Sequence, residues 1–401
     1  MFDIFAGGEN RIILPSYVYP LLLVAPSILL AAIVAIPNNK LPSWVKQCLS
    51  VPLLLAVFLI PFGFTNGNKV FDLTASVTSY NLFLRHLELY WIGPLIQGKP
   101  VYASLESLWI EFWSCLCTFP EKNKQDKAKA YAKDKKFYHI LFYLLIHLFI
   151  TDLLANWATS FTGQEIVIME QERPVTYFIY VLTCIIVLNS AFNVIGYSLQ
   201  LFYCLCFEHG SWSSEQWRPL MKNPILANSL NDLWSHRWHQ LFKTTWLTLP
   251  FRPVRLLLMR LLTKLIKNPK PIAFMAASLS VFVASAFMHE YAVAANLGWR
   301  LYSRVFKGEQ CIFFIGHGIA VIIEQFIKTM LIPSQLKRSS WMQLSGHVWT
   351  AAVGYVSFYY IAHGFLSWGF QFDNPITFMQ PYIKHYVYAH PILHSYFGSR
   401  F

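Results

Sequence analysis

The stretch PIAFMAASLSVFVASAFMHEYAVAANL, residues 271–297, decides the class of fold. It holds a single acidic residue, Glu290, and no lysine or arginine. A helix that crosses a membrane needs about 20 predominantly apolar residues. In lipid, such a chain must satisfy its backbone polar groups within itself, and a helix does so. The stretch therefore predicts a membrane-spanning helix.

Comparable apolar stretches recur along the chain. They lie at residues 12–36, 45–64, 137–157, 175–206, 311–332 and 341–370, and an eighth, poorly bounded span is expected between residues 80 and 117. Only 13% of the 401 residues are charged, whereas a soluble domain has about 25%. This composition excludes a soluble enzyme and predicts an all-α, polytopic integral membrane helix bundle with about eight transmembrane helices.

The charges of the loops predict the orientation. Residues 121–136 hold seven lysines, and residues 208–270 hold ten basic residues against three acidic ones. Residues 159–173, which lie between them, hold three glutamates and one arginine. Because basic loops stay on the cytosolic side, we expect the first two loops in the cytosol and the third in the lumen. The net charge of +12 then reflects topology, and no nucleic-acid partner is expected.

The second basic loop contains the segment NSLNDLWSHRWHQLFK, residues 228–243. At about 100° per residue its apolar side chains gather on one side, which predicts an amphipathic helix at the cytosolic membrane surface. Arg237 projects among the leucines of that side, where it either snorkels to lipid headgroups or meets an anionic group such as a phosphate. His236 and His239 have the spacing of half a metal site, but no further ligands accompany them, so no metal is expected.

Polar side chains also form stripes on the predicted spans. His289 shares one stripe with Ser278, Ser285 and Asn296, and Glu290 points about 100° away from it. Three other helical faces carry Asn189 with Asn193, His317 with Glu324, and Gln343 with His347 and Thr350. Hydrogen bonds between helices would explain each stripe alone. Together with a buried histidine, the stripes predict a central polar cavity or tunnel, used either for a reaction or for permeation.

His289 is a candidate general base, because a neutral histidine suits proton transfer from a hydroxyl group. The sequence has no G-x-S-x-G motif, so a serine acyl-enzyme is not indicated. A direct transfer between two bound substrates needs only a base, donors for the oxyanion and exclusion of water. A membrane interior excludes water and would protect an activated acyl group from hydrolysis.

The two segments, in this order and at this spacing, resemble the membrane-bound O-acyltransferase superfamily and, within it, the wax synthase-like branch. Members of that branch have a segment of the form N-x-x-x-[DE]-[FL]-W-x-x-R-W-[HN] and a later histidine in a membrane helix. The matching residues here are Asn228, Asp232, Leu233, Trp234, Arg237, Trp238, His239 and His289. Plant wax ester synthases and fungal terpenoid O-acetyltransferases share this signature. The resemblance is strong over about 70 residues, in the region 223–297, within what we expect to be a single transmembrane acyltransferase domain, residues 1–401.

The resemblance implies an enzyme that moves a long-chain or acetyl group from acyl-CoA to the hydroxyl of a lipophilic alcohol, with no other cofactor. The alcohol would be a fatty alcohol, a sterol, a terpenoid or a diacylglycerol. His289 would be the catalytic base, and His239 would orient the thioester or assist the leaving group. The implied substrate-binding and CoA-binding residues are Asn228, Asp232, Trp234, Arg237, Trp238, Ser285 and Glu290.

The implied location is the endoplasmic reticulum membrane, with the motif facing the cytosol and with the lipid bilayer as the other partner. One departure concerns Ser235 and His236, which replace a glycine and an arginine often found in the plant enzymes. This departure leaves the class of substrate open.

A membrane transporter or channel is the alternative, because the same polar stripes would line a permeation path. The sequence has no internal repeat, so an inverted-repeat transporter gains no support. A haem or di-iron protein is a third class, but the closely spaced histidine boxes of di-iron membrane enzymes are missing.

Overall fold

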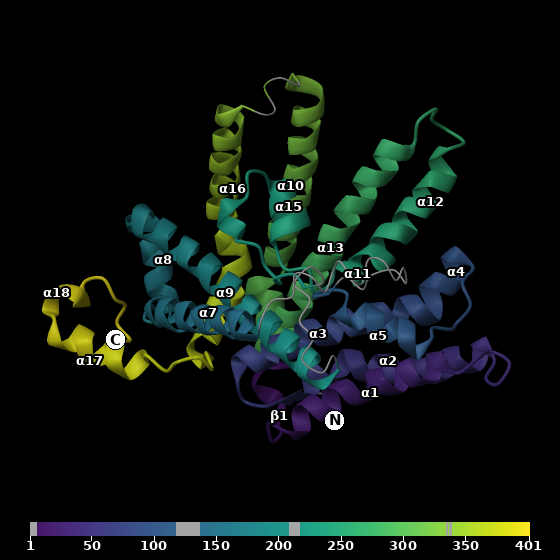
Figure 1. Ribbon diagram of the computed structural model, residues 1–401, viewed down its shortest axis with the longest axis horizontal. Helices are drawn as coiled ribbons and strands as arrows, with labels where there is room; N and C mark the ends of the chain where they lie inside the picture. The colour runs from purple at the N-terminus through teal and green to yellow at the C-terminus, as the bar shows by residue number, and fades with distance from the viewer. Residues whose placement is uncertain (1–5, 118–136, 208–216, 334–335, 337–338) are drawn as a thin grey trace. The chain divides into compact units, whose positions relative to one another are not determined.

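The computed structural model describes residues 6–117, 137–207, 217–333, 336 and 339–401 (Figure 1). The lysine-rich segment 121–136, on which part of the predicted orientation rests, lies outside these residues. The regular secondary structure of the described residues is helical, apart from one pair of two-residue strands and an isolated bridge between Cys117 and Trp217. The predicted all-α class is confirmed.

Helix packing divides the chain into two compact units, each described by itself. Unit 1 comprises Met1–Phe112, Phe242–Ile323 and Tyr359–Asp373. Unit 2 comprises Trp113–Leu241, Glu324–Phe358 and Asn374–Phe401. Two long helices contribute residues to both units, namely α15 (Glu309–Phe326), which continues as a π-helical turn over Ile327–Leu331, and α16 (Ser340–Trp368).

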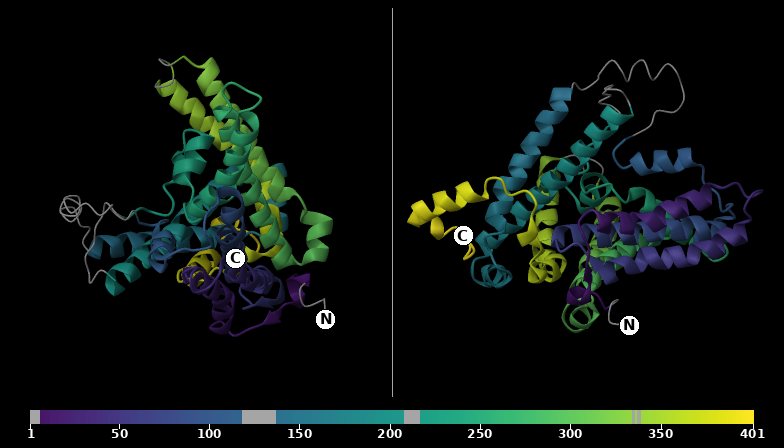
Figure 2. Two further views of the ribbon diagram at one scale, coloured as in Figure 1. Left: turned by 90° about the vertical axis from the view of Figure 1, so that its right-hand side faces the viewer. Right: turned by 90° about the horizontal axis from the view of Figure 1, so that it is seen from below.

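Unit 1 is built on the N-terminal helices and α13. Three helices pack side by side in it, namely α1 (Val18–Ala35), α2 (Ser43–Gly63) and α3 (Lys69–Leu87), and α3 also packs against α13 (Lys270–Leu297) (Figure 2). The two strands, β1 (Ile12–Ile13) and β2 (Phe64–Thr65), pair in parallel. The buried guanidinium of Arg11 lies 3.0 Å from the carboxylate of Asp72 and donates to Oδ1 of Asn296 at 2.9 Å. A buried charge needs a paired and hydrogen-bonded partner. This network therefore attaches the segment before β1 to α3 and to the end of α13.

The shorter helical elements that follow α3 or flank α13 complete unit 1. They are the π-helical turns Glu88–Ile92, Leu247–Phe251 and Tyr302–Phe306, the helices α4 (Gly93–Gln97), α5 (Leu105–Trp113), α11 (Lys243–Trp246), α12 (Arg252–Leu262) and α14 (Trp299–Leu301), and the 3-10 turns Gly8–Asn10 and Phe370–Asp373.

The poorly bounded span expected between residues 80 and 117 overlaps a helical run over residues 69–97, in which α3, the π-helical turn and α4 follow one another without a gap. Gly98 adopts a left-handed conformation (φ 65°) directly after α4 and ends it, as glycine does at helix C-termini. The guanidinium of Arg85 pairs with the carboxylates of Glu88 and Glu111, so the charges of this region bind one another across the break. This helical run and α5 lie on either side of Gly98, and the expected span stays a prediction.

Unit 2 is built on α7 and α9, which pack along one another. Its elements are α7 (Phe137–Ala158), α8 (Gly163–Glu172), α9 (Pro174–Cys206), the 3-10 turn Pro224–Leu226, α10 (Leu230–Asp232), the π-helical turn Leu233–Arg237, α17 (Gln380–Ala389) and α18 (Pro391–His394). Trp113, the last residue of α5, belongs to unit 2 and forms an aromatic cluster in its core with Tyr203 and Trp217. Helix α8 begins with a reciprocal cap between Thr162 and Glu165, which satisfies the first free amides of the helix.

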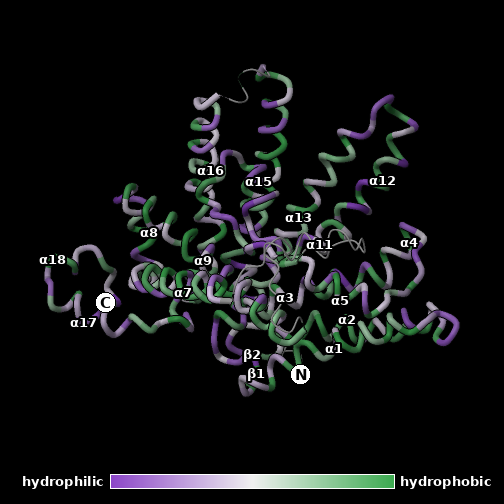
Figure 3. The backbone as a smooth tube through the Cα atoms, in the orientation of Figure 1, coloured by the Kyte–Doolittle hydropathy of each residue, from purple (hydrophilic) through white to green (hydrophobic). Residues whose placement is uncertain are grey.

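Six helices of the described residues are long and apolar enough to cross a membrane. They are Val18–Ala35, Ser43–Gly63, Tyr138–Ala158, Pro174–Cys206, Lys270–Leu297 and Glu309–Leu331. Figure 3 shows α1 and α2 as largely hydrophobic tubes, and all six helices correspond to predicted spans. Helix α16 coincides with the predicted span 341–370 but is not among the six. The chain is thus an integral membrane protein, and the count of eight spans stays a prediction.

Candidate active site

The motif segment forms a short helix that changes its pitch. The hydroxyl of Ser229 accepts a hydrogen bond of 2.9 Å from the amide of Asp232 and caps α10. The next five residues, Leu233–Arg237, form a π-helical turn, and Trp238 is already extended (φ −67°, ψ 157°). The amphipathic helix predicted over residues 228–243 is therefore wrong in its extent, since a separate helix, α11, begins only at Lys243.

Arg237 explains where the helix ends. Its Nε donates to the carboxylate of Asp232, and its Nη1 donates to the carbonyl oxygens of Lys222 and Asn223 at 3.2 and 3.4 Å. Its own carbonyl accepts from the amide of Lys222 at 2.9 Å. A π-turn bonds residues that are five apart, which is the separation of Asp232 and Arg237. The wheel that placed Arg237 among Leu230, Leu233 and Leu241 assumed a regular α-helix, so that placement was wrong.

Glu324 of α15 caps the N-terminus of the motif helix. Its carboxylate accepts from the amide of Leu230 at 2.7 Å and faces that of Asn231 at 3.5 Å, and it lies 3.0 Å from Nζ of Lys328. The first amides of a helix have no partner inside the helix and carry a partial positive charge. The buried carboxylate of Glu324, 6% exposed, meets both needs.

Helix α16 contacts the residues just before the motif helix. The ring Nδ1 of His347 lies 2.9 Å from the carbonyl oxygen of Ala227. At Gly346 an added Cβ would overlap the carbonyl oxygen of Asn228. The backbone of Asn228 can approach α16 this closely only because residue 346 has no side chain.

Two asparagines of α9 hold the irregular stretch before Pro224. Asn193 accepts from the amide of Met221 and donates to its carbonyl oxygen, both at 3.2 Å. Asn189 accepts from the amide of Asn223 at 3.1 Å. Asn189, Asn193, Glu324 and His347 all come from stripes that were predicted to face a polar cavity. In the structure these four side chains bind backbone groups of residues 221–231.

His239 stacks on an aromatic residue of α9. Its ring lies 4.7 Å from the ring of Phe192, at an interplanar angle of 21°. Trp234 and Trp238 lie with their rings 5.3 Å apart beside it. His239 is outside the six candidate spans, and burial lowers its pKa to about 4. The imidazole is therefore neutral near pH 7, able to give and accept hydrogen bonds but without a positive charge.

His289 is half-buried on α13, between two aromatic rings of unit 1. Its ring stacks on Phe314 of α15 at 4.4 Å and meets the ring of Phe365 at 6.4 Å, nearly edge on. Ser285 lies one helical turn earlier and is also half-buried. The carboxylate of the buried Glu290 accepts from the amide of Cys311 at 3.1 Å, in the first turn of α15. Glu290 therefore faces a neighbouring helix, as Glu324 does.

The structure brings the predicted site residues together in two sets. Asn228, Asp232, Trp234, Arg237, Trp238 and His239 lie in one continuous segment of unit 2, whereas Ser285, His289 and Glu290 lie on α13 of unit 1. Within the described ranges, no group of three or more His, Cys, Asp or Glu residues is placed to hold a metal ion. Phe192 and Phe314 were not predicted, because an aromatic residue on an apolar span has the same sequence pattern whether it faces lipid or a histidine.

Residues 217–315 match the family model described as membrane bound O-acyl transferase family. The predicted resemblance is confirmed. A long-chain-alcohol O-fatty-acyltransferase of Simmondsia chinensis is 28% identical over 114 residues, which are 27% of this chain and 28% of that protein. The similarity thus spans little more than a quarter of the length of that relative.

The residues that match the membrane-bound O-acyltransferase model contain some of the contacts of the site and leave others out. The match includes the motif segment, His289 and the first turn of α15, where Cys311 meets Glu290. It ends before Glu324 and begins after Asn193. The side chains that hold the motif segment from α9, α15 and α16 therefore lie outside the matched residues.

Proposed function

We propose that this protein is an acyl-CoA-dependent O-acyltransferase that forms an ester with a lipophilic alcohol. One observation carries the proposal: the family match contains both the segment Trp234–His239 and the helix with His289. The printed activity of the relative from Simmondsia chinensis, transfer of a fatty acyl group to a long-chain alcohol, supports this class of acceptor. A sterol, a terpenoid or a diacylglycerol has the same reacting hydroxyl group.

In the proposed reaction His289 takes the proton from the acceptor hydroxyl. The hydroxyl oxygen attacks the thioester carbonyl and forms a new C–O bond. The C–S bond then breaks, and CoA leaves as a thiol after it takes up the proton held by His289. The ring of His289 is held by Phe314 in a stacked contact, which supports a fixed orientation for this transfer.

His239 and Arg237 have roles in binding the donor. A neutral His239 presents one N–H, which is suited to the carbonyl oxygen of the thioester. Arg237 is about one-quarter exposed, at 27%, and uses Nε and Nη1 within the described part of the chain. Its Nη2 is thereby left for a phosphate of CoA. Asp232 orients this guanidinium. The other residues form the substrate-binding surfaces of the motif segment and of α13; they are Asn228, Trp234 and Trp238 on the former and Ser285 and Glu290 on the latter.

The proposed setting is the endoplasmic reticulum membrane, with the motif segment on the cytosolic side. Acyl-CoA is soluble enough to arrive from the cytosol, whereas the alcohol dissolves in the bilayer. The basic residues that flank the motif support this orientation.

The test is ester formation by purified protein in lipid vesicles. Acetyl-CoA, palmitoyl-CoA or oleoyl-CoA is combined with hexadecanol or a sterol, and mass spectrometry identifies the product. We expect His289→Ala to lower the rate by about 10² to 10⁴-fold, the range for loss of a general base. His147→Ala is the matched control, since His147 also lies half-buried in a candidate span, on α7.

Ester formed by His289→Ala at the normal rate would contradict the mechanism. Solute flux through the vesicles with no ester from any pair of substrates would favour the transporter instead.

A further inference from the structure

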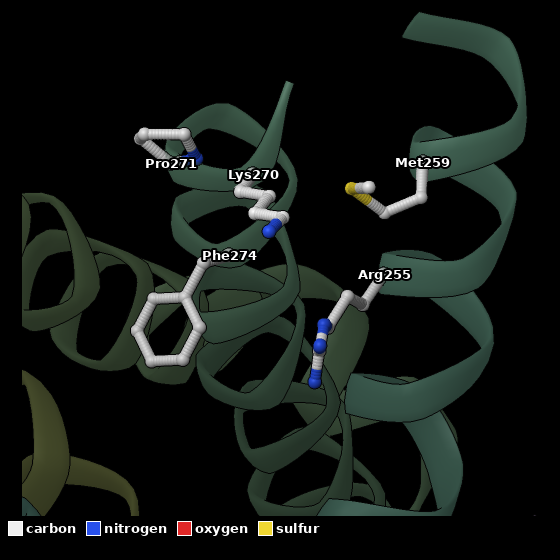
Figure 4. Close-up of a pocket in the computed structure, with 5 residues that line it drawn as sticks. All are labelled: Arg255, Met259, Lys270, Pro271 and Phe274. Atoms are coloured by element: carbon white, nitrogen blue, oxygen red, sulfur yellow. The ribbon is translucent and has the colours of Figure 1, made fainter. Parts of the chain in front are cut away.

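Helix α12 and the first turn of α13 enclose a groove of about 420 Å³ (Figure 4). The two helices pack side by side in unit 1. Arg255 and Met259 of α12 line the groove with Lys270, Pro271 and Phe274 of α13. Two cationic groups and an apolar floor thus open on the same space.

The segment around this groove is strongly basic. Residues 252–270 contain six basic side chains and no acidic one, namely Arg252, Arg255, Arg260, Lys264, Lys267 and Lys270. All six are exposed. The structure records no hydrogen bond or ion pair from the side chain of Arg255 or Lys270 to any other residue that it describes. Both cations are therefore open to an external anion.

The same segment exposes large apolar side chains. Leu257, Leu261 and Leu265 are 51%, 55% and 79% exposed, and Phe274 is 57% exposed. Leu257 and Leu261 lie on the face of α12 opposite Arg252 and Arg255 at about 100° per residue. Figure 3 shows hydrophilic and hydrophobic residues alternating along α12. A helix with one basic and one apolar face is stable where water meets lipid.

We propose that the groove between α12 and α13 binds the phosphate of an anionic phospholipid at the level of the lipid headgroups. Arg255 and Lys270 bind the phosphate, Met259 and Phe274 contact the acyl chains, and the exposed leucines enter the bilayer. The proposal does not depend on the acyl-transfer reaction.

Charge complementarity along the whole segment favours a lipid surface over CoA as the source of the phosphate. The basic residues extend from residue 252 to residue 270, well beyond the groove. A single CoA in the groove would leave the outer lysines unpaired and the leucines in water. An anionic leaflet neutralises the basic residues at about 1 kcal/mol each and covers the leucines.

The test measures lipid binding to the full chain. Protein in detergent micelles is titrated with dioleoylphosphatidylglycerol, with dioleoylphosphatidylcholine or with free CoA, and native mass spectrometry counts the adducts. In Arg255→Gln/Lys270→Gln we expect phosphatidylglycerol to bind about 30-fold more weakly, or about 2 kcal/mol. Phosphatidylcholine binding should not change.

Two further variants test whether the loss of binding depends on the groove and on its charge. Arg300→Gln/Arg304→Gln removes the same charge from exposed positions of unit 1 outside the groove, and we expect less than about threefold loss of phosphatidylglycerol. Arg255→Lys/Lys270→Arg keeps the charge and should bind as the wild type does. Equal losses in the glutamine pairs, loss in the charge-keeping variant, or loss of CoA binding in place of lipid binding would each overturn the proposal.

Discussion

Replacement of Gly346 by alanine tests whether α16 holds the motif segment. An alanine Cβ at this position would overlap the carbonyl oxygen of Asn228 and would lie 3.1 Å from its carbonyl carbon. Both atoms belong to the backbone, so no change of rotamer relieves the overlap. Either α16 or the residues before α10 must move.

The magnitude follows from two opposing effects. In a helix interior, alanine is more stable than glycine by about 0.5–1 kcal/mol. Overpacking costs about 1–3 kcal/mol. Gly354 lies in the same helix, and no described atom outside the helix lies within 4 Å of a Cβ added there. Gly354→Ala therefore measures the helical gain alone, and Gly346→Ala should be less stable than Gly354→Ala by about 1–3 kcal/mol.

The assay is unfolding of the purified protein in detergent micelles, followed by tryptophan fluorescence. Ester formation by the same samples gives a second measurement. Because Asn228 leads into the segment that carries Arg237 and His239, we expect Gly346→Ala to lower the rate of ester formation, while Gly354→Ala leaves it unchanged. Equal stability of the two variants would refute the close contact between α16 and Asn228.

Three other side chains give separate tests. Glu324→Gln removes the charge that faces the amide of Leu230, and we expect a free energy of unfolding lower by about 1–2 kcal/mol; an unchanged value would exclude the cap. His239 has a pKa of about 4 when folded, against 6.5 when unfolded. The unfolded chain then binds more protons between these values, so stability is complete above about pH 6.5 and falls as the pH drops toward 4. His239→Gln should lose this part of the pH dependence, and a profile like that of the wild type would contradict the burial of the ring. Arg237→Lys keeps the charge but not the fork that reaches Asp232 and the two carbonyl groups. We expect it to raise KM for acyl-CoA by about tenfold or more, as for loss of a charged hydrogen bond, whereas an unchanged KM would remove Arg237 from the donor site.

The spans were predictable because the lipid requires apolar residues along the whole helix, and this requirement can be recognised in the sequence without knowledge of the tertiary contacts. The stretch 271–297 coincides with α13 to within one residue. The region 80–117 was harder, because its charged residues find partners in one another. The ion pairs of Arg85 with Glu88 and Glu111 join residues up to 26 apart. A hydropathy profile scores such charged residues as unfavourable for a membrane span and does not show that they form ion pairs.

The motif segment shows a different limit. Its residues were identified, and the bonds of Arg237 to Asp232 and of Ser229 to the amide of Asp232 are local. Its shape was mistaken, because the bonds of Arg237 to Lys222 and Asn223 favour a wider turn. A helical wheel assumes the pitch of a regular α-helix, and such tertiary contacts change that pitch.

The polar stripes show a third limit, because the sequence identified the polar residues but not their hydrogen-bond partners. An irregular backbone beside apolar helices must satisfy each amide and carbonyl group, at a cost of about 1–3 kcal/mol for each one left unpaired. Residues 221–231 are such a backbone, and Asn189, Asn193, Glu324 and His347 supply the missing partners. A polar stripe on a span therefore need not line a path for solutes. Once these four side chains are assigned to the backbone, their three stripes give less support to a permeation path. The stripe of His289 and the motif segment remain to be explained by chemistry.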